Sequence, residues 1–210
     1  MSCRNKTFFV VEDHTVTNIG LVQLIAQKTG LESSGSAFSK TEALEKIKIL
    51  ADGGIEKLPD IMILDLYLGK ESGLDLLREM KTNYPSVKVL VYSMYAKPGI
   101  LSLALEAGAH GFVEKTAPES VLITAIKNIL AGETFVQQNL VSPLFTYKTM
   151  YEGLTRQEQN VLKKILERKS RVQIAEELNI VPRSVDNYIS HLFDKTGCKG
   201  IDEIISKFSE

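Results

Sequence analysis

The chain has 210 residues, of which 44% are hydrophobic and 24% are charged, and its formal net charge is −1. This composition excludes a disordered, collagen-like or fibrous protein, and the length allows one large domain or two small ones. The nearly neutral total shows none of the basic excess that marks many nucleic-acid-binding proteins.

Residues 1–133 alternate short apolar runs with longer stretches of helical periodicity. The predicted strands are Phe8–Val11, a weaker segment at Leu31–Phe38, Ile61–Leu64, Val87–Tyr92 and Gly111–Val113. Between the strands, apolar residues recur at helical spacing, and the segment Ser39-Lys40-Thr41-Glu42 has the pattern of a capping box. Continuous apolar strands that alternate with helices predict a doubly wound, five-stranded parallel sheet with helices on both faces.

Residues 134–150 show no sustained period, and we expect a linker there. From residue 151 the pattern is purely helical, with capping boxes at Thr155-Arg156-Gln157-Glu158 and Ser170-Arg171-Val172-Gln173. Pro182 suits the first position of a helix that Gly197 ends, after a short turn. Residues 151–210 are therefore predicted to form a small all-α domain of four helices built around a helix-turn-helix unit.

Acidic side chains follow two of the predicted strands. Glu12 and Asp13 follow the first strand and Asp65 follows the third, so the three carboxylates should converge at one edge of the sheet. Such a cluster repels itself unless a cation compensates it, and Mg²⁺ takes carboxylate oxygens as ligands. Ser93 and Lys115 follow two further strands. A carboxylate, a metal, a hydroxyl and an ammonium group are the components that phosphoryl transfer to an aspartate needs.

With these residues the chain resembles a bacterial response regulator of the NarL/LuxR type, and the resemblance extends over nearly its whole length. The receiver part of the resemblance lies in Glu12-Asp13, Asp65-Leu66, Gly73, Ser93 and Lys115. The chain departs from the usual pattern at Leu68-Gly69-Lys70, where Met-Pro is common, and at Thr116, where receivers often have proline. Neither departure removes a chemical group.

The resemblance implies a role for each of these residues. Asp65 would be the phosphoacceptor, with a partner histidine kinase as the phosphoryl source. The implied Mg²⁺ ligands are Glu12, Asp13, Asp65 and the Tyr67 carbonyl. Ser93 and Lys115 would contact phosphoryl oxygens, and Phe112 matches the aromatic switch position.

The second half resembles the LuxR-type DNA-binding domain, with Pro182–Thr196 as the recognition helix in the major groove. The DNA-binding candidates are Arg171, Arg183, Ser184, Asp186, Asn187, Ser190, Lys195 and Lys199. The family usually has lysine at position 186 and at position 190. Residues 134–210 hold 11 basic and 10 acidic side chains, against 14 and 16 in residues 1–133. So small an excess predicts few phosphate contacts and binding as a homodimer.

The sequence thus predicts a transcriptional response regulator that is not an enzyme, in which phosphorylation of Asp65 controls DNA binding. Two alternatives stay open: DNA binding that is independent of phosphorylation, and a helical domain that contacts protein instead of DNA. A third alternative is an enzyme of another class that shares the doubly wound sheet. No stretch approaches the roughly 20 apolar residues of a membrane span, and Cys3 and Cys198 lie far apart. We expect a cytoplasmic protein with no membrane partner.

Overall fold

The computed structural model describes residues 5–209, which form two compact units. The first unit contains the chain up to Met94 and Ala104–Gln137, and the second contains Tyr95–Leu103 and the chain from Gln138 onward. No helix among the described residues has both the length and the apolar character that crossing a membrane requires. Cys3 lies outside the described residues, and Cys198 is a buried free thiol.

The first unit is built on a parallel sheet of six strands in the order β2-β1-β3-β6-β7-β8. The strands are β1 (Thr7–Val11), β2 (Glu32–Ala37), β3 (Ile61–Leu64), β6 (Lys88–Ser93), β7 (Gly111–Glu114) and β8 (Phe135–Val136). A separate antiparallel pair consists of β4 (Tyr67–Leu68) and β5 (Glu71–Ser72). The doubly wound parallel sheet is confirmed, and the five predicted strands all form.

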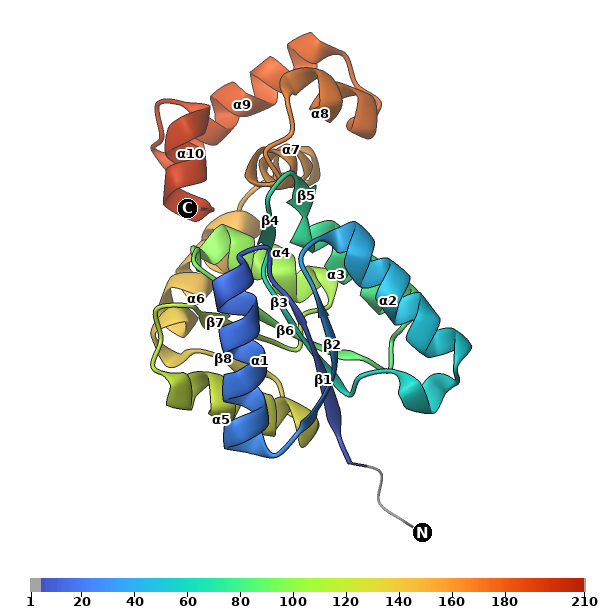
Figure 1. Ribbon diagram of the computed structural model, residues 1–210. Coiled ribbons are helices and arrows are strands. Elements are labelled where there is room, and N and C mark those ends of the chain that lie inside the picture. The colour runs from blue at the N-terminus through green and yellow to red at the C-terminus, as the bar shows by residue number, and fades with distance from the viewer. Residues whose placement is uncertain (1–4, 210) are drawn as a thin grey trace. The chain divides into compact units, whose positions relative to one another are not determined.

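Helices cover both faces of this sheet (Figure 1). The helices are α1 (Thr15–Thr29), α2 (Lys40–Asp52), α3 (Gly73–Asn83) and α5 (Glu119–Leu130), with a short 3₁₀ turn at Ile55–Lys57. A further helix, α4 (Pro98–Ala107), begins in the second unit and ends in the first. Apolar side chains of β1 and β3 pack with α1 and α5 in one buried cluster that includes Phe8, Ile25, Ile63 and Ile126. Because β1 and β3 are buried on both faces, their sequences are continuous apolar runs.

The predicted strand count of five is wrong by one. Phe135–Val136 pairs with Gly111–Phe112 as the sixth, edge strand β8. Most of the expected linker at residues 134–150 is also regular, because α6 spans Gln138–Glu152 with Leu140, Leu144 and Tyr147 buried. A two-residue strand is too short to show a period, and polar residues and a proline inside α6 mask its apolar face. The domain boundaries at residues 133 and 150 stay a prediction.

The second unit contains the four predicted helices, which are α7 (Arg156–Leu166), α8 (Arg171–Leu178), α9 (Pro182–Thr196) and α10 (Ile201–Phe208). Both capping boxes are formed, at Thr155 with Glu158 and at Ser170 with Gln173. A short turn joins α8 to α9, and Gly197 ends α9 in the left-handed conformation. The helix-turn-helix prediction is confirmed.

One buried carboxylate links the ends of α7 and α9. Glu158 is 3% exposed, and its Oε2 accepts hydrogen bonds from the Thr155 backbone N–H at 2.7 Å and from Lys195 Nζ at 2.6 Å. Burial alone would raise the pKa of Glu158, but the bonds from Lys195 and Thr155 outweigh it, so the pKa is lowered. The ionised form of this side chain therefore stabilises the folded unit.

Gly73 is the first residue of α3, and a substitution at this position tests how tightly the loop after β3 is packed. A Cβ at Gly73 would lie 2.6 Å from Leu66 Cα, with Asp65 O also in contact, whereas a Cβ at Gly20 in α1 would meet nothing within 4 Å. We expect Gly73→Ala to lower the free energy of unfolding by about 1–3 kcal/mol through overpacking. Gly20→Ala should raise it by roughly 0.5–1 kcal/mol through helix propensity. Urea unfolding followed by circular dichroism measures the free energy of unfolding of both variants. If Gly73→Ala changed it by the same amount and in the same direction as Gly20→Ala, the tight packing at Gly73 would be contradicted.

Glu158 makes the stability of the second unit depend on pH. A carboxyl group whose pKa is lowered by folding contributes stability above its unfolded pKa of about 4.3, and that contribution is lost as the pH falls further. We expect Glu158→Gln to melt below the wild type at neutral pH, with the difference shrinking as the pH is lowered through this range. Glu176→Gln, an exposed change on α8, is the control and should show no such trend. If the difference in melting temperature between Glu158→Gln and the wild type were the same at every pH, the ionised form of Glu158 would not be what stabilises the unit.

Candidate functional site

Strand register brings the acidic residues together. β1 pairs directly with β3, so Val11 lies beside Leu64, and the residues that follow these two positions meet at one edge of the sheet. Glu12 is 1% exposed and Asp65 is 5% exposed, which is unusual for carboxylates. The Glu12 and Asp65 carboxylates therefore lie at the same edge of the sheet.

The Lys115 ammonium group lies between two of these carboxylates. Its Nζ is 2.5 Å from Glu12 Oε2 and 2.6 Å from Asp65 Oδ2, and the Lys115 side chain is only 10% exposed. Burial alone would lower the pKa of Lys115, but the hydrogen bonds and negative charges of Asp65 and Glu12 outweigh it and raise the pKa. The lysine therefore stays charged and compensates part of the negative charge.

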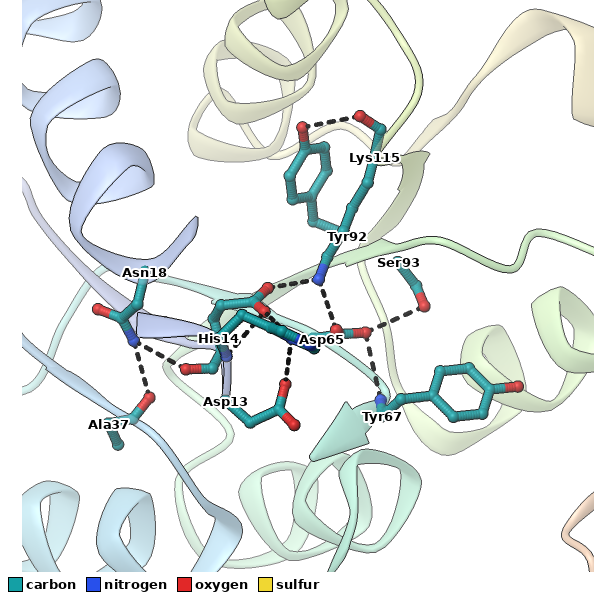
Figure 2. A network of polar contacts seen from close by, with 10 residues as sticks. Asp13, His14, Asn18, Ala37, Asp65, Tyr67, Tyr92, Ser93 and Lys115 are labelled. Atoms are coloured by element: carbon teal, nitrogen blue, oxygen red, sulfur yellow. Dashed lines mark hydrogen bonds and ion pairs between the residues drawn. The ribbon is translucent and has the colours of Figure 1, made fainter. Parts of the chain in front are cut away.

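The second oxygen of Asp65 has two other partners. Ser93 Oγ donates to Asp65 Oδ1 at 3.0 Å, and the Tyr67 backbone N–H donates to the same oxygen at 3.2 Å. Figure 2 shows these two donors on one side of the Asp65 carboxylate and Lys115 on the other. Ser93 is fully buried at the end of β6, and the Lys115 backbone N–H donates to Ser93 O at 2.9 Å. The ends of β6 and β7 thus hold the Ser93 hydroxyl and the Lys115 ammonium group against Asp65.

A separate group of donor atoms lies beside Asp65. Glu12, Asp13 and His14 each present one ligand atom, and these atoms lie within 4.8 Å of one another. His14 Nδ1 is 2.8 Å from Asp13 Oδ1 and 3.1 Å from Glu12 Oε1, although the His14 side chain is largely exposed. Asp65 is joined to this group through Lys115, which contacts both Asp65 and Glu12.

These residues fit a divalent cation. Three carboxylates and one ammonium group leave an excess of negative charge in a largely buried place. Asp13 Oδ1 is buried and has no hydrogen bond of regular geometry among the described residues, although His14 Nδ1 lies 2.8 Å from it. A cation bound to this oxygen would offset the free-energy cost of burying it.

Two residues near this site, Asn18 and Tyr92, carry no motif signal in the sequence. Asn18 is 1% exposed, and its Nδ2 donates to Glu12 O and to Ala37 O, both at 3.0 Å, which holds the β1 end in place. The Tyr92 hydroxyl donates to Lys115 O at 3.4 Å. Sequence reasoning missed Asn18, because the only signal would have been its burial in the first turn of α1, and burial is not visible in the sequence. Phe112 is fully buried in β7, three residues before Lys115.

The sequence-predicted DNA-binding residues do not form one group. Arg183, Asp186, Asn187 and Ser190 are exposed at helical spacing along one face of α9, while Ser184 is half-buried. Arg171, the first residue of α8, lies beside this face with its Nε 3.3 Å from Asp186 Oδ1.

The remaining two candidates lie farther along the chain. Lys195 is in the last turn of α9, where its charge pairs with Glu158. Lys199 follows α9, and its backbone N–H donates to Glu203 Oε2 at 2.6 Å. The pairing of Lys195 inside the unit leaves fewer cations for phosphate groups than the sequence alone suggests.

Comparison with known proteins covers both units. Residues 8–127 match the family described as "Response regulator receiver domain", and residues 152–208 match the family described as "Bacterial regulatory proteins, luxR family". The chain is 28% identical over 204 residues to the transcriptional activator protein ExaE of Pseudomonas putida, covering 93% of this chain and 92% of that one. It is 29% identical over 196 residues to the DNA-binding transcriptional activator DevR/DosR of Mycobacterium tuberculosis, covering 90% and 87%.

Solved structures agree on the fold. RcsB from Salmonella enterica serovar Typhimurium, bound to promoter rprA in the presence of phosphomimetic BeF3-, is similar with a TM-score of 0.72 and 20% identity. That similarity covers 99% of this chain and 100% of RcsB. The first matched family spans more than half of the chain, and the second covers most of the helical part. The chain therefore belongs to the response regulators of the NarL/LuxR type, which join a receiver domain to a LuxR-type helix-turn-helix domain.

Proposed function

We propose that Asp65 accepts a phosphoryl group from a histidine kinase and that this modification controls DNA binding by α9. The observation that carries the proposal is the surroundings of Asp65, with Lys115 Nζ on one oxygen at 2.6 Å and Ser93 Oγ on the other at 3.0 Å. These contacts orient a nearly buried carboxylate whose attack on phosphorus forms the new P–O bond while the bond to the donor breaks. The chain acts in this proposal as a regulator, not as an enzyme that turns over a substrate.

The metal in this proposal is Mg²⁺, held by Glu12, Asp13, Asp65 and the Tyr67 carbonyl. When bound, Mg²⁺ supplies charge neutralisation for the transferred phosphoryl group. The burial of Asp13 Oδ1 and the excess of carboxylates at this place support the assignment of Mg²⁺. Lys115 and Ser93 then offer an ammonium and a hydroxyl donor to the oxygens of the phosphoryl group, which carries about −1.5 to −2 charge.

The response to phosphorylation begins in the strands that hold these donors. Phe112 is buried in β7, next to Val91 of β6 in the strand pairing, and Ser93 ends β6. Movement of Ser93 toward a phosphoryl oxygen would disturb the packing of the Phe112 ring, because a close-packed core transmits small shifts. We assign Phe112 as the switch residue on this basis.

The output in this proposal is sequence-specific binding to double-stranded DNA in the cytoplasm, as a homodimer. The exposed face of α9 and the N-terminus of α8 supply the contacts, through Arg171, Arg183, Asp186, Asn187 and Ser190, with Ser184, Lys195 and Lys199 nearby. The small basic excess of this half of the chain favours two copies on the DNA, since each supplies few phosphate contacts.

Asp65→Asn should abolish phosphoryl transfer from a small phosphodonor in the presence of Mg²⁺, because an amide is not a nucleophile for phosphorus. Intact-mass spectrometry measures the modified fraction over time. Asp52→Asn, a change of the same kind at an exposed position of α2, should be modified at the wild-type rate. Modification of the Asp65→Asn protein at that rate would show that the acceptor is another residue.

The same site should also respond to a phosphoryl mimic. Beryllofluoride with Mg²⁺ should raise the affinity of the wild-type protein for its DNA and leave the Asp65→Asn protein unchanged. If DNA binding by the wild type is equally strong with and without beryllofluoride, binding is independent of phosphorylation.

Binding to genomic DNA fragments should weaken with salt, because phosphate contacts release counterions. Arg183→Ala should lower the magnitude of the log K against log [salt] slope by about 1 if this side chain contacts a phosphate group. Lys148→Ala removes the same charge from an exposed position of α6, outside the helix-turn-helix, and should leave the slope unchanged. A wild-type slope near zero with no enriched sequence would instead indicate that the helical unit binds protein.

A further inference from the structure

Asp186 lies in the middle of the exposed face of α9. Its neighbours on that face are Arg183, Asn187 and Ser190, one helical turn or less away. In helix-turn-helix proteins, residues in the N-terminal half of the recognition helix contact base edges. Asp186 is the fifth residue of α9, so it belongs to the part of the helix that reaches the bases.

A carboxylate in this position would repel the phosphate backbone unless a cation offsets it. Arg171, at the first position of α8, supplies that cation through the contact of its Nε with Asp186 Oδ1 at 3.3 Å. Both side chains are more than half exposed, so the pair adds little to folding stability. The contact uses one of the five guanidinium N–H groups, which leaves donors for the DNA backbone.

We infer that Asp186, neutralised by Arg171, accepts a hydrogen bond from the N4 amine of a cytosine in the major groove. This inference rests on the proposed DNA binding and specifies one base of the recognised site. An ionised carboxylate has only acceptors. Guanine and thymine present acceptors to the major groove, whereas cytosine presents its N4 amine as a donor. Adenine presents a donor and an acceptor side by side, which suits an amide such as that of Asn187 better than a carboxylate.

Selection of binding fragments from random double-stranded DNA by the full-length protein, with Mg²⁺ and beryllofluoride, tests the assignment. We expect the wild-type motif to contain one position that is cytosine, and replacement of that base to weaken binding about tenfold. Asp186→Asn should exchange the preference at that position from cytosine to adenine. Asp186→Ala should lose the preference there without gaining another.

Two further variants serve as controls. Asp194→Asn removes the same charge from an exposed position two turns farther along α9, and it should leave every base preference unchanged. Arg171→Ala should weaken binding to all sequences alike while cytosine stays preferred. Circular dichroism melts show whether each of the four variants is folded, and the three side chains that they change are exposed.

The outcomes separate this inference from the proposed function. If the wild type enriches no motif, the proposed DNA recognition fails and this inference fails with it. If the wild type enriches a motif and both Asp186 variants keep every base preference, DNA recognition stands and Asp186 does not read a base. Tighter binding by Arg171→Ala would overturn the neutralising role of Arg171.

Discussion

The contact of Lys115 with Glu12 and Asp65 is the constraint on which the first unit depends. One ammonium group serves two nearly buried carboxylates that come from neighbouring strands, and the lysine itself comes from the end of a third. Removing one partner would leave a buried charge without compensation, which is costly. The strands must therefore hold a fixed register, and the apolar side chains of β1 and β3 help to set it by packing against α1 and α5.

The second unit also buries a carboxylate beside a lysine, but here the pair joins two helices. Its buried carboxylate, Glu158, is satisfied internally by the Thr155 backbone and by Lys195, with His191 Nδ1 3.6 Å from its other oxygen, so it joins α7 to α9. The polar groups of α9 that remain exposed include acids as well as a base. A surface with so little positive charge gains less binding free energy from contacts with DNA phosphates. Its binding to DNA then depends more on contacts with base edges, which also carry the specificity.

Particular segments show why part of the fold could be predicted and part could not. The apolar runs and the capping boxes at Thr155 and Ser170 are local signals, and each forms the predicted element. β8 and the β4–β5 pair each involve strands of two residues, which are stabilised by a partner strand and not by their own pattern. The Asn18 side chain joins the ends of β1 and β2, a contact that only the folded chain creates.

The amino-acid sequence by itself determined the two kinds of unit and placed the acids, the hydroxyl and the lysine at strand ends, because period and strand alternation are local properties. The tertiary structure decided which of these groups touch. It placed Lys115 on both Glu12 and Asp65, and it assigned Lys195 to Glu158. It also brought Arg171 to Asp186 across the turn between two helices. Such pairings depend on distances of a few ångströms between residues far apart in the chain, and only strand register and helix packing set those distances.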